Sequence, residues 1–394
     1  MLVGLQMRGI YKTIQVTAFL SFLLFANLIA FGQSVKNFLP DPNLIFEEEI
    51  VKNSDFSLTN VHSIFQSSDG YIWLGSGEGV VRYDGYDYEY IEKDSLNDQI
   101  NCFLEDENKD IWVGSNSGLY KIRNKKIIPF PNIGGLNKMQ INSIFRSKNG
   151  VIWIGALRGL YKYENGKIDT TQFPFSGRGV ETVAEDKNGM LWIGTAGNGI
   201  YLIKDNKVIA RISEKEGLPS RAINHIIVDS KNNAWVATKK SLIKFTDYKF
   251  QIFDQNDGID NQVINYVYED RKSNIWIATE GGLFLQTGIG FKKFSFNEGL
   301  SNDLVYCLYE DRENNLYVGV HSNVLNKLRV SRLKIFNTRH GLSSSWIWSI
   351  LQDSRGDIWV GTHGNGVDRI SKGKVFNYSI KNGLPGNYIR TIGE

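Results

Sequence analysis

Polar and aromatic side chains recur at one position of a repeated segment, just after the start of a short apolar strand. Asparagine is depleted in strands, so four copies of it at this position are unusual. A primary amide both donates and accepts hydrogen bonds, and a ring of such groups could bind sugar hydroxyls or ordered water. The competing interpretation is that each amide bonds the backbone of the adjacent loop and fixes its geometry. The residues at this position are His62, Asn101, Asn142, Glu181, Asn224, Asn265, Tyr306 and Trp348.

A second set of candidate ligand-binding residues lies in the loops beside these strand starts. Each of them alone is also compatible with an ordinary solvated loop position. Trp346 and Trp348 alternate across one strand start, where exposed aromatic rings could stack on a sugar face or pack between repeats. The loop candidates are Arg158, Arg178, Arg221, Lys239, Glu280, His321, Trp346 and His363.

The histidines, cysteines and net charge argue against several other functions. Cys102 and Cys307 occupy the same position in copies five apart, too distant for a disulfide, so we expect two free, buried thiols. A formal charge of +3 suggests no nucleic-acid surface. We therefore expect no metal, no cofactor and no nucleic-acid partner. The five histidines show no shared metal-ligand spacing; they are His62, His225, His321, His340 and His363.

The strands that must position these side chains belong to a sequence repeat, and each copy contains one aromatic residue at the equivalent position, hereafter its anchor. The spacings between successive anchors are 39, 41, 39, 43, 41, 41 and 42 residues, the period of four-stranded propeller blades. In a radial array these large side chains must be buried between neighbouring blades. We expect them to have a structural role. The anchors are Trp73, Trp112, Trp153, Trp192, Trp235, Trp276, Tyr317 and Trp359.

An acidic turn precedes each aromatic strand. In the pattern Asp-x-x-Gly the carboxylate can accept a hydrogen bond from the backbone N–H two residues on, while glycine or asparagine adopts a positive φ. We expect the positive φ at Gly70, Gly150, Gly189 and Gly356, and at Asn233, Asn274 and Asn315 in the other copies. The acidic turns should share one rim of the propeller. The Gly-Leu segments and the candidate loops should share the other rim, where propellers often bind ligands.

The number of copies predicts the domain organisation. We expect a signal peptide at 1–32, a first all-β propeller of seven four-stranded antiparallel blades at 41–332, and the opening of a second propeller at 333–394. A single eight-bladed propeller is the alternative. Residues 44–50 should supply the outer strand of the closing blade. Because 382–394 match the start of a ninth copy, we expect the sequence to be the N-terminal part of a longer protein.

The N-terminal segment has the features of an export signal. Arg8 and Lys12 precede an apolar run from Val16 to Phe31, and small residues follow near a cleavage site at Gln33. An uncleaved membrane anchor is the alternative, although the apolar run is shorter than the ~20 residues that a span needs. The composition elsewhere, with 22% charged residues and seven prolines, indicates an ordered globular chain.

The phrase Glu-Asp-x-x-Gly-x-Ile-Trp-x-Gly-Thr, preceded by Gly-Leu-Ser or Gly-Leu-Pro, resembles the two-component regulator propeller repeat from about Asn60 to Glu394. The resemblance implies the periplasmic sensor region of a membrane receptor. Two seven-bladed propellers, a β-sandwich, a membrane helix and an output module are usual in that family. Any kinase activity would then lie downstream of residue 394, and the chain itself would not be an enzyme.

The resemblance also implies the partners. We expect a carbohydrate or another small polar ligand, the remainder of the receptor chain, and homodimerisation of the full-length form. Two alternatives remain open, a scaffold for protein partners and a propeller enzyme similar to the streptogramin lyases. An enzyme would need convergent acid, base or metal groups on the channel face.

Overall fold

The computed structural model describes residues 44–49, 59–92, 95–169, 173, 179–259, 263–287, 290–322, 325–330, 336–338, 341–371 and 374–393. The expected signal segment at 1–32, Arg178 and His340 lie outside these residues. In the described parts of the chain, no helix is long and apolar enough to cross a membrane.

Eight four-stranded antiparallel sheets make up the structure, which confirms the all-β class and the blade type. We number the sheets 1 to 8 along the chain. Their strands are β2 (Ser63–Gln66), β3 (Ile72–Ser76), β4 (Gly79–Tyr83) and β5 (Tyr88–Tyr90); β6 (Ile100–Glu105), β7 (Ile111–Ser115), β8 (Leu119–Arg123) and β9 (Lys126–Pro129); β10 (Ile141–Arg146), β11 (Ile152–Ala156), β12 (Gly159–Glu164) and β13 (Lys167–Asp169); β14 (Val180–Glu185), β15 (Leu191–Thr195), β16 (Ile200–Lys204) and β17 (Lys207–Ile212); β18 (Ile223–Val228), β19 (Ala234–Thr238), β20 (Leu242–Thr246) and β21 (Lys249–Phe253); β22 (Ile264–Glu269), β23 (Ile275–Thr279), β24 (Gly282–Thr287) and β25 (Gly290–Phe294); β26 (Val305–Glu310), β27 (Leu316–Val320) and β28 (Leu325–Val330) with β1 (Leu44–Glu49); and β29 (Ile347–Gln352), β30 (Ile358–Thr362), β31 (Val367–Ser371) and β32 (Lys374–Tyr378).

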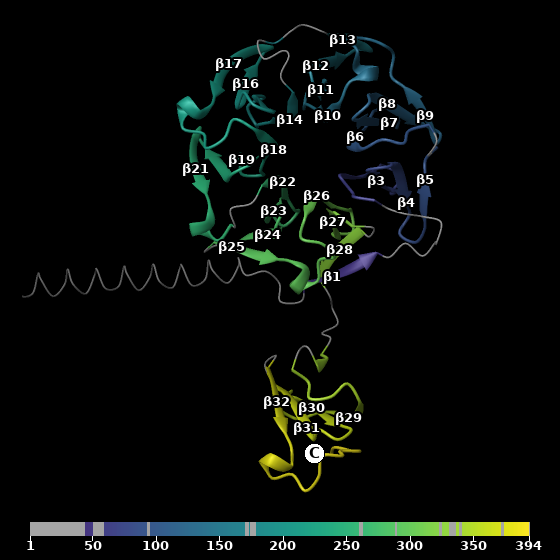
Figure 1. The fold of residues 1–394 in the computed structure, drawn as a ribbon, viewed down its shortest axis with the longest axis vertical. Coiled ribbons are helices and arrows are strands. Elements are labelled where there is room, and N and C mark those ends of the chain that lie inside the picture. The colour runs from purple at the N-terminus through teal and green to yellow at the C-terminus, as the bar shows by residue number, and fades with distance from the viewer. Residues whose placement is uncertain are drawn as a thin grey trace, which may run out of the picture. The chain divides into compact units, whose positions relative to one another are not determined.

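Sheets 1 to 7 surround a central channel, with the first strand of each sheet innermost (Figure 1). The ring closes where β2 lies against β26. β1 pairs antiparallel with β28, from Leu44 opposite Val330 to Glu49 opposite Leu325, so the N-terminal strand completes sheet 7 as expected. The chain divides into two compact units, 1–330 and 331–394, and sheet 8 belongs to the second.

Short 3-10 helices occupy several of the connections that lead into an inner strand. Four of them begin with a full capping box, as in Ser213 with Glu216, and end at a glycine of positive φ such as Gly217. The following apolar residue, Leu218 in this copy, is buried. The repeated Gly-Leu pair is therefore a helix end followed by an apolar anchor. The helices are η1 (Leu136–Lys138), η2 (Glu214–Glu216), η3 (Gln255–Asp257), η4 (Phe296–Glu298) and η6 (Ile380–Asn382).

A single aspartate carboxylate holds the backbone of the acidic turn in place, and Asp229 is an example. Its Oδ1 accepts the backbone N–H of Lys231 at 3.0 Å and of Asn233 at 2.7 Å. Its Oδ2 accepts the indole N–H of Trp235 at 2.9 Å. The same indole bond, also at 2.9 Å, joins Trp112, Trp276 and Trp359 to the aspartates of their own turns. The carboxylate therefore satisfies the turn backbone and the polar edge of a large buried ring together.

The positive φ in these turns lies one residue earlier than expected in the asparagine copies. Gly70, Gly150, Gly189 and Gly356 do have positive φ, but the equivalent residues elsewhere are Asn232, Ser273 and Asn314, with φ near 65°. The expectation for Asn233, Asn274 and Asn315 was therefore wrong. Those residues instead donate their side-chain N–H groups to the turn aspartate, at 2.7 to 2.8 Å.

In most sheets, a glycine in the second strand lets the sheet approach the next one closely. An added Cβ on Gly194 would lie 2.5 Å from Thr182 Cγ2 and 2.7 Å from Cγ2 of Ile223 in sheet 5. The inner strand of the neighbouring sheet thus takes the space of a missing side chain. Apolar clusters fill the rest of each seam, where Trp192 of sheet 4 lies 5.2 Å from the ring of Phe245 in sheet 5.

On the rim that carries the acidic turns, hereafter the turn rim, a second contact joins the sheets. The backbone N–H that follows the turn aspartate or serine donates to a side-chain oxygen of the next sheet at 2.7 to 2.9 Å. The pairs are Ser68 with Glu105, Lys148 with Glu185, Lys187 with Asn232, Ser230 with Glu269, Arg271 with Glu310 and Arg312 with Gln66. Most of these acceptors end an inner strand, so the glutamate of the repeated Glu-Asp pair bridges two sheets.

The glycine contact predicts a matched pair of substitutions. Gly194→Ala should lower the free energy of unfolding by about 1–3 kcal/mol, because the methyl group has no space against Thr182 and Ile223. Gly197→Ala should change it by less than about 0.5 kcal/mol, since nothing lies within 4 Å of the added Cβ. Urea denaturation measures both. Equal stability of the two variants would contradict this account of the seam.

Candidate functional site

The recurring polar position forms β-bulges at the start of the inner strands. In sheet 2, Ile100 pairs with Ser115 and Cys102 with Gly114, which leaves Asn101 as the extra residue. The same shift occurs at Asn142, Glu181, Asn224, Asn265, Tyr306 and Trp348. A bulge redirects its side chain out of the strand alternation. The bulges lie at the opposite rim from the acidic turns, hereafter the loop rim.

Four amides at these bulges reach across to the next sheet. Asn101 Nδ2 donates to Ile141 O at 2.9 Å, and Asn224 Nδ2 donates to Ile264 O at 2.8 Å. Asn142 and Asn265 donate in the same way to Val180 O and Val305 O. The acceptor is the carbonyl of a neighbouring strand rather than the adjacent loop that the competing interpretation named. These amides therefore join the sheets, and two of them, Asn101 and Asn142, also line the channel cavity.

In four of the seven ring sheets, the loop after the second strand adds a polar side chain to a partial second circle around the mouth of the channel; these are Asn116, Lys239, Glu280 and His321. Asn101 Nδ2 also lies 3.0 Å from Asn116 Oδ1, and the Tyr306 hydroxyl lies 3.1 Å from His321 Nδ1. The His62 ring lies 4.3 Å from that of Tyr306, across the seam between sheets 7 and 1. Lys239, Glu280 and His321 are exposed in this circle. The structure thus brings these three predicted residues to one opening, beside the bulges.

Burial sets the charge states around the mouth. It lowers the pKa of His62 to about 4, helped by the nearby His321, so the ring is neutral at pH 7. Burial raises the pKa of Glu181, while Lys239 lowers it. Burial also raises the pKa of Tyr306, with a further increase from Glu280. The mouth therefore combines neutral hydrogen-bonding groups with a few charges of both signs.

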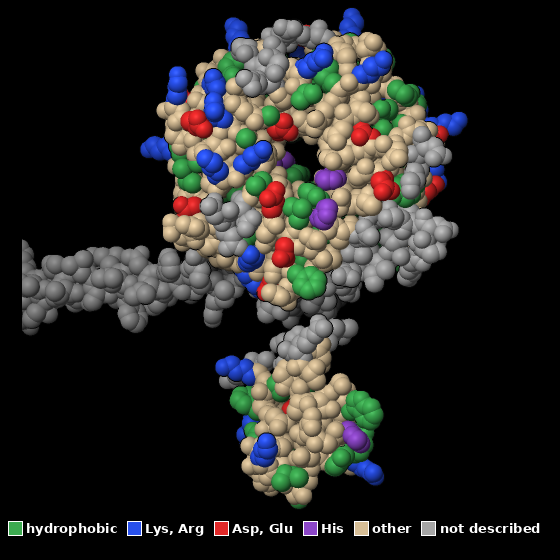
Figure 2. Space-filling view, in the orientation of Figure 1, with side chains coloured by type: hydrophobic (Ala, Val, Ile, Leu, Met, Phe, Trp, Pro, Cys, Tyr) green, Lys and Arg blue, Asp and Glu red, His purple; other side chains and the backbone are tan. Residues whose placement is uncertain are grey.

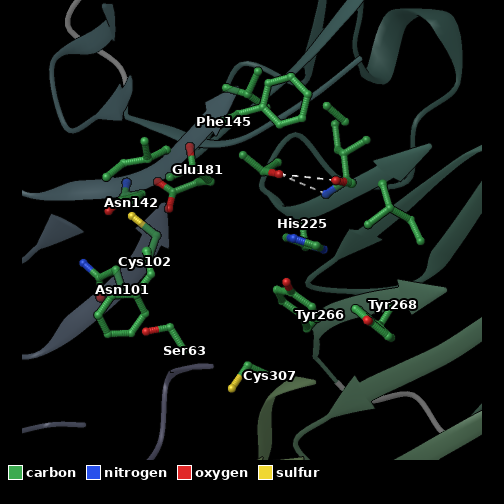
Figure 3. A pocket seen from close by; sticks show the side chains of 18 of the residues that line it. Ser63, Asn101, Cys102, Asn142, Phe145, Glu181, His225, Tyr266, Tyr268 and Cys307 are labelled. Atoms are coloured by element: carbon green, nitrogen blue, oxygen red, sulfur yellow. Dashed lines mark hydrogen bonds between the residues drawn. The ribbon is translucent and has the colours of Figure 1, made fainter. Parts of the chain in front are cut away.

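The channel below the mouth holds a cavity of about 470 Å³. Figure 2 shows the hollow at the centre of the ring, with histidine and acidic side chains near its edge. In Figure 3, Asn101, Asn142 and Glu181 lie on one side of the cavity and His225 and Tyr266 on the other. The last two rings stack at 3.7 Å and 20°. A small polar molecule could therefore enter between hydrogen-bonding and aromatic walls.

Within the described chain, no contact connects the remaining predicted loop residues to the side chains around the channel mouth. Arg158 is exposed, and Arg221 pairs with Glu214 at 3.3 Å. Arg178 lies outside the described residues. Trp346 and His363 belong to the second unit, where their rings are 5.3 Å apart and Trp348 lies 4.6 Å from His363. The side chain of Trp346 is 67% exposed.

The anchors and the cysteines are placed as follows. Trp73, Trp112, Trp153, Trp192, Trp235, Trp276 and Tyr317 are at most 5% exposed, and Trp359 is half-buried. Both cysteines are free and both line the channel cavity; Cys307 is buried as expected, whereas Cys102 is only half-buried. Burial raises the pKa of the Cys102 thiol to about 12. Among the described residues, no three His, Cys, Asp or Glu side chains are placed to hold a metal.

His225 should make the ring sensitive to acid. Burial lowers its pKa to about 3, below the ordinary value near 6.5, so the unfolded chain binds more protons between these limits and stability falls as the pH drops below 6.5. His225→Phe keeps an aromatic ring there. Its stability difference between pH 7 and 4.5 should be smaller than that of the wild type by about 2 kcal/mol. Urea denaturation at both pH values tests this, and an unchanged difference would contradict it.

Comparison with known proteins identifies the repeat. Residues 55–78, 94–117, 174–197, 258–281, 299–322 and 341–364 match the family described as two component regulator propeller. No curated protein matches the chain.

Solved structures with a similar fold include extracellular domains from B. thetaiotaomicron. The domain of BT3049, assigned as a hybrid two component system, aligns with a TM-score of 0.65 and 23% identity over 78% of this chain and 43% of its own. The domain of BT4673, of the same assignment, aligns with a TM-score of 0.60 and 20% identity over 88% of this chain and 49% of its own. This chain therefore spans less than half the length of either domain.

An enzyme shares the ring fold. The virginiamycin B lyase from Staphylococcus aureus, in complex with quinupristin, aligns with a TM-score of 0.58 and 14% identity over 73% of this chain and all of its own. Likenesses at this level of identity concern the fold alone. The repeat matches, which extend over both units, are the more specific finding, and they place the chain in the two component regulator propeller family.

Proposed function

We propose that this chain is the ligand-sensing part of an exported, periplasmic receptor, and that the mouth of the ring channel binds an oligosaccharide or another small polar ligand. The observation that carries the proposal is the circle of polar side chains at the bulges, with a partial second circle from the loops, around the mouth of a channel that holds a cavity of about 470 Å³. Family membership and the extracellular neighbours support an exported sensor.

The chemistry of the mouth suits a ligand with many hydroxyl groups. Neutral His62 and the Tyr306 hydroxyl offer both donors and acceptors at close range. Lys239 can donate to a ring or glycosidic oxygen, and Glu280 can accept from a hydroxyl. The stacked rings of His225 and Tyr266 add an aromatic wall. Few fixed charges and many weak polar contacts favour a neutral polar ligand over a highly charged one.

The signal would pass to an output module in the remainder of the receptor, and the full-length form would act as a dimer. An enzyme similar to the streptogramin lyases is the second candidate, because virginiamycin B lyase shares the ring fold over its whole length. A scaffold for protein partners is the third. Turnover of a bound ligand by the purified chain would favour the second candidate, and capture of a protein without any glycan effect would favour the third.

Substitutions at the mouth should weaken ligand binding without unfolding the ring. A library of neutral and acidic oligosaccharides is screened by thermal shift, and hits are measured by calorimetry. Lys239→Ala and Glu280→Ala should each reduce affinity about tenfold, equivalent to about 1.4 kcal/mol for one lost charge-assisted hydrogen bond. Both side chains are exposed, so the melting temperature without ligand should stay within 2 °C.

Lys207→Ala is the matched control, because Lys207 is an exposed lysine at the start of β17 on the turn rim. It should leave the affinity unchanged. Equal losses in the control and in the mouth variants would place the ligand elsewhere on the chain. Absence of any binding across the library, with the protein folded, would overturn the sensing proposal.

A further inference from the structure

One of the seven seams on the turn rim lacks the bridging acceptor found in the other six. The position that holds Gln66, Glu105, Glu185, Glu269 and Glu310 in other sheets is occupied by Arg146 in sheet 3. An arginine has no acceptor atom. At the seam between sheets 2 and 3, the backbone N–H that follows the turn aspartate therefore cannot donate a hydrogen bond to this side chain.

Two donors at this seam are left without an acceptor. The backbone N–H of Glu107, which follows Asp106, makes no hydrogen bond within the described chain. Arg146 donates from Nη2 to Glu105 O at 3.0 Å, but its Nε is buried and has no partner. The buried Nε of Arg146 costs free energy without a partner, and such a group calls for an explanation in a native structure.

A third donor lies nearby. The side-chain oxygen of Asn149 accepts from Ser147 Oγ and from the Val151 N–H, which leaves its NH₂ group to donate. Glu107, Arg146 and Asn149 all line a pocket of about 320 Å³ between the turns of sheets 2 and 3. The pocket thus opens where the acceptor is missing.

Two of the three carboxylates around this pocket are already compensated, and the third, Glu107, belongs to an exposed residue. Asp106 accepts from Lys121 Nζ at 3.0 Å and from the indole of Trp112 at 2.9 Å. Glu164 pairs with Lys162 at 2.9 Å. Arg146, in contrast, forms no ion pair with a described residue. Its guanidinium group and the two N–H donors therefore favour an anionic acceptor in the pocket.

A second pocket of about 280 Å³ adjoins the first and shares Tyr163 and Gly166 with it; Asp110, Lys121 and Arg123 line one part of it. Phe130, Pro131 and Ile133 line its apolar part. A molecule that placed a charged end beside Arg146 could rest an apolar group there. Phosphate or sulfate would use only the charged half of the site.

We propose that this seam is a second binding site, on the opposite rim from the channel mouth, for a small organic acid with an apolar substituent. One carboxylate oxygen would accept from the Glu107 N–H, as Glu105 Oε2 accepts from Ser68 at 2.7 Å in the preceding seam. Arg146 and Asn149 would hold the other oxygen. The ligand carboxylate would take the place of the glutamate that ends the inner strands of sheets 2, 4, 6 and 7. Sheet 5 also lacks this glutamate, with Val228 there, but Asn232 supplies the acceptor at that seam. The site is independent of the sensing proposal, since none of its residues lies at the mouth.

Binding of 3-phenylpropanoate to the full chain tests this proposal, with 3-phenylpropanamide as the uncharged analogue and inorganic phosphate as the anion without an apolar group. We expect saturable calorimetric binding of the carboxylate and at least tenfold weaker binding of the other two. Arg146→Glu supplies the missing acceptor within the chain. It should abolish carboxylate binding and raise the melting temperature of the free protein by a few degrees.

Arg146→Gln, which copies Gln66 of sheet 1, repeats the test without adding charge and serves if the first variant folds poorly. Lys187→Ala, at another turn on the same rim, is the control and should bind the carboxylate as the wild type does. Undiminished binding in the Arg146 variants would overturn the proposal. So would wild-type protein that shows no saturable binding up to 10 mM, or equal affinity for the amide and the carboxylate.

Discussion

The ring depends on a contact in which residues at the start of one inner strand take the space of a missing side chain in the preceding sheet. Gly75, Gly114, Gly155, Gly194 and Gly319 each meet the next inner strand so closely that a Cβ would lie within 3 Å of it. Two sheets depart from this rule with Ala237 and Ala278. In those sheets the facing positions hold the larger rings of His225 and Tyr266. The close approach therefore shapes the channel wall, because those two rings turn toward the cavity and stack.

Hydrogen bonds at both rims hold these close seams in register. On the loop rim, bulged asparagines donate to the first carbonyl of the next inner strand. On the turn rim, strand-ending glutamates accept a turn N–H from the preceding sheet. Each bond alone contributes modestly to stability, but a donor or acceptor left open in a seam is costly. Positions where the pattern breaks are consequently the places where a ligand atom can complete it.

Much of the scaffold could be predicted from the sequence because it repeats. The anchor spacing predicted four-stranded sheets, and the unmatched segment before the first copy predicted the pairing of β1 with β28. The prediction of positive φ in the asparagine turns was wrong by one residue. Asn232 and Asn233 are adjacent, and only the backbone structure shows which of the two has the positive φ. The target of each bulged amide was also hidden, since it lies on a strand about 40 residues away. The glutamate bridges could have been suspected from the recurrence of Glu before Asp.

The pairing of β1 with β28 also determines the order in which the ring can form. Leu44 and its partner Val330 are separated by 286 residues (330 − 44), so this pair has one of the longest sequence separations in the ring. Contacts between such distant segments are slow to form, because the entropy of closing the intervening chain opposes them. Six sheets can form from local meanders as the chain emerges, whereas the seventh waits for both of its ends. The first described strand along the chain is thus among the last to be paired.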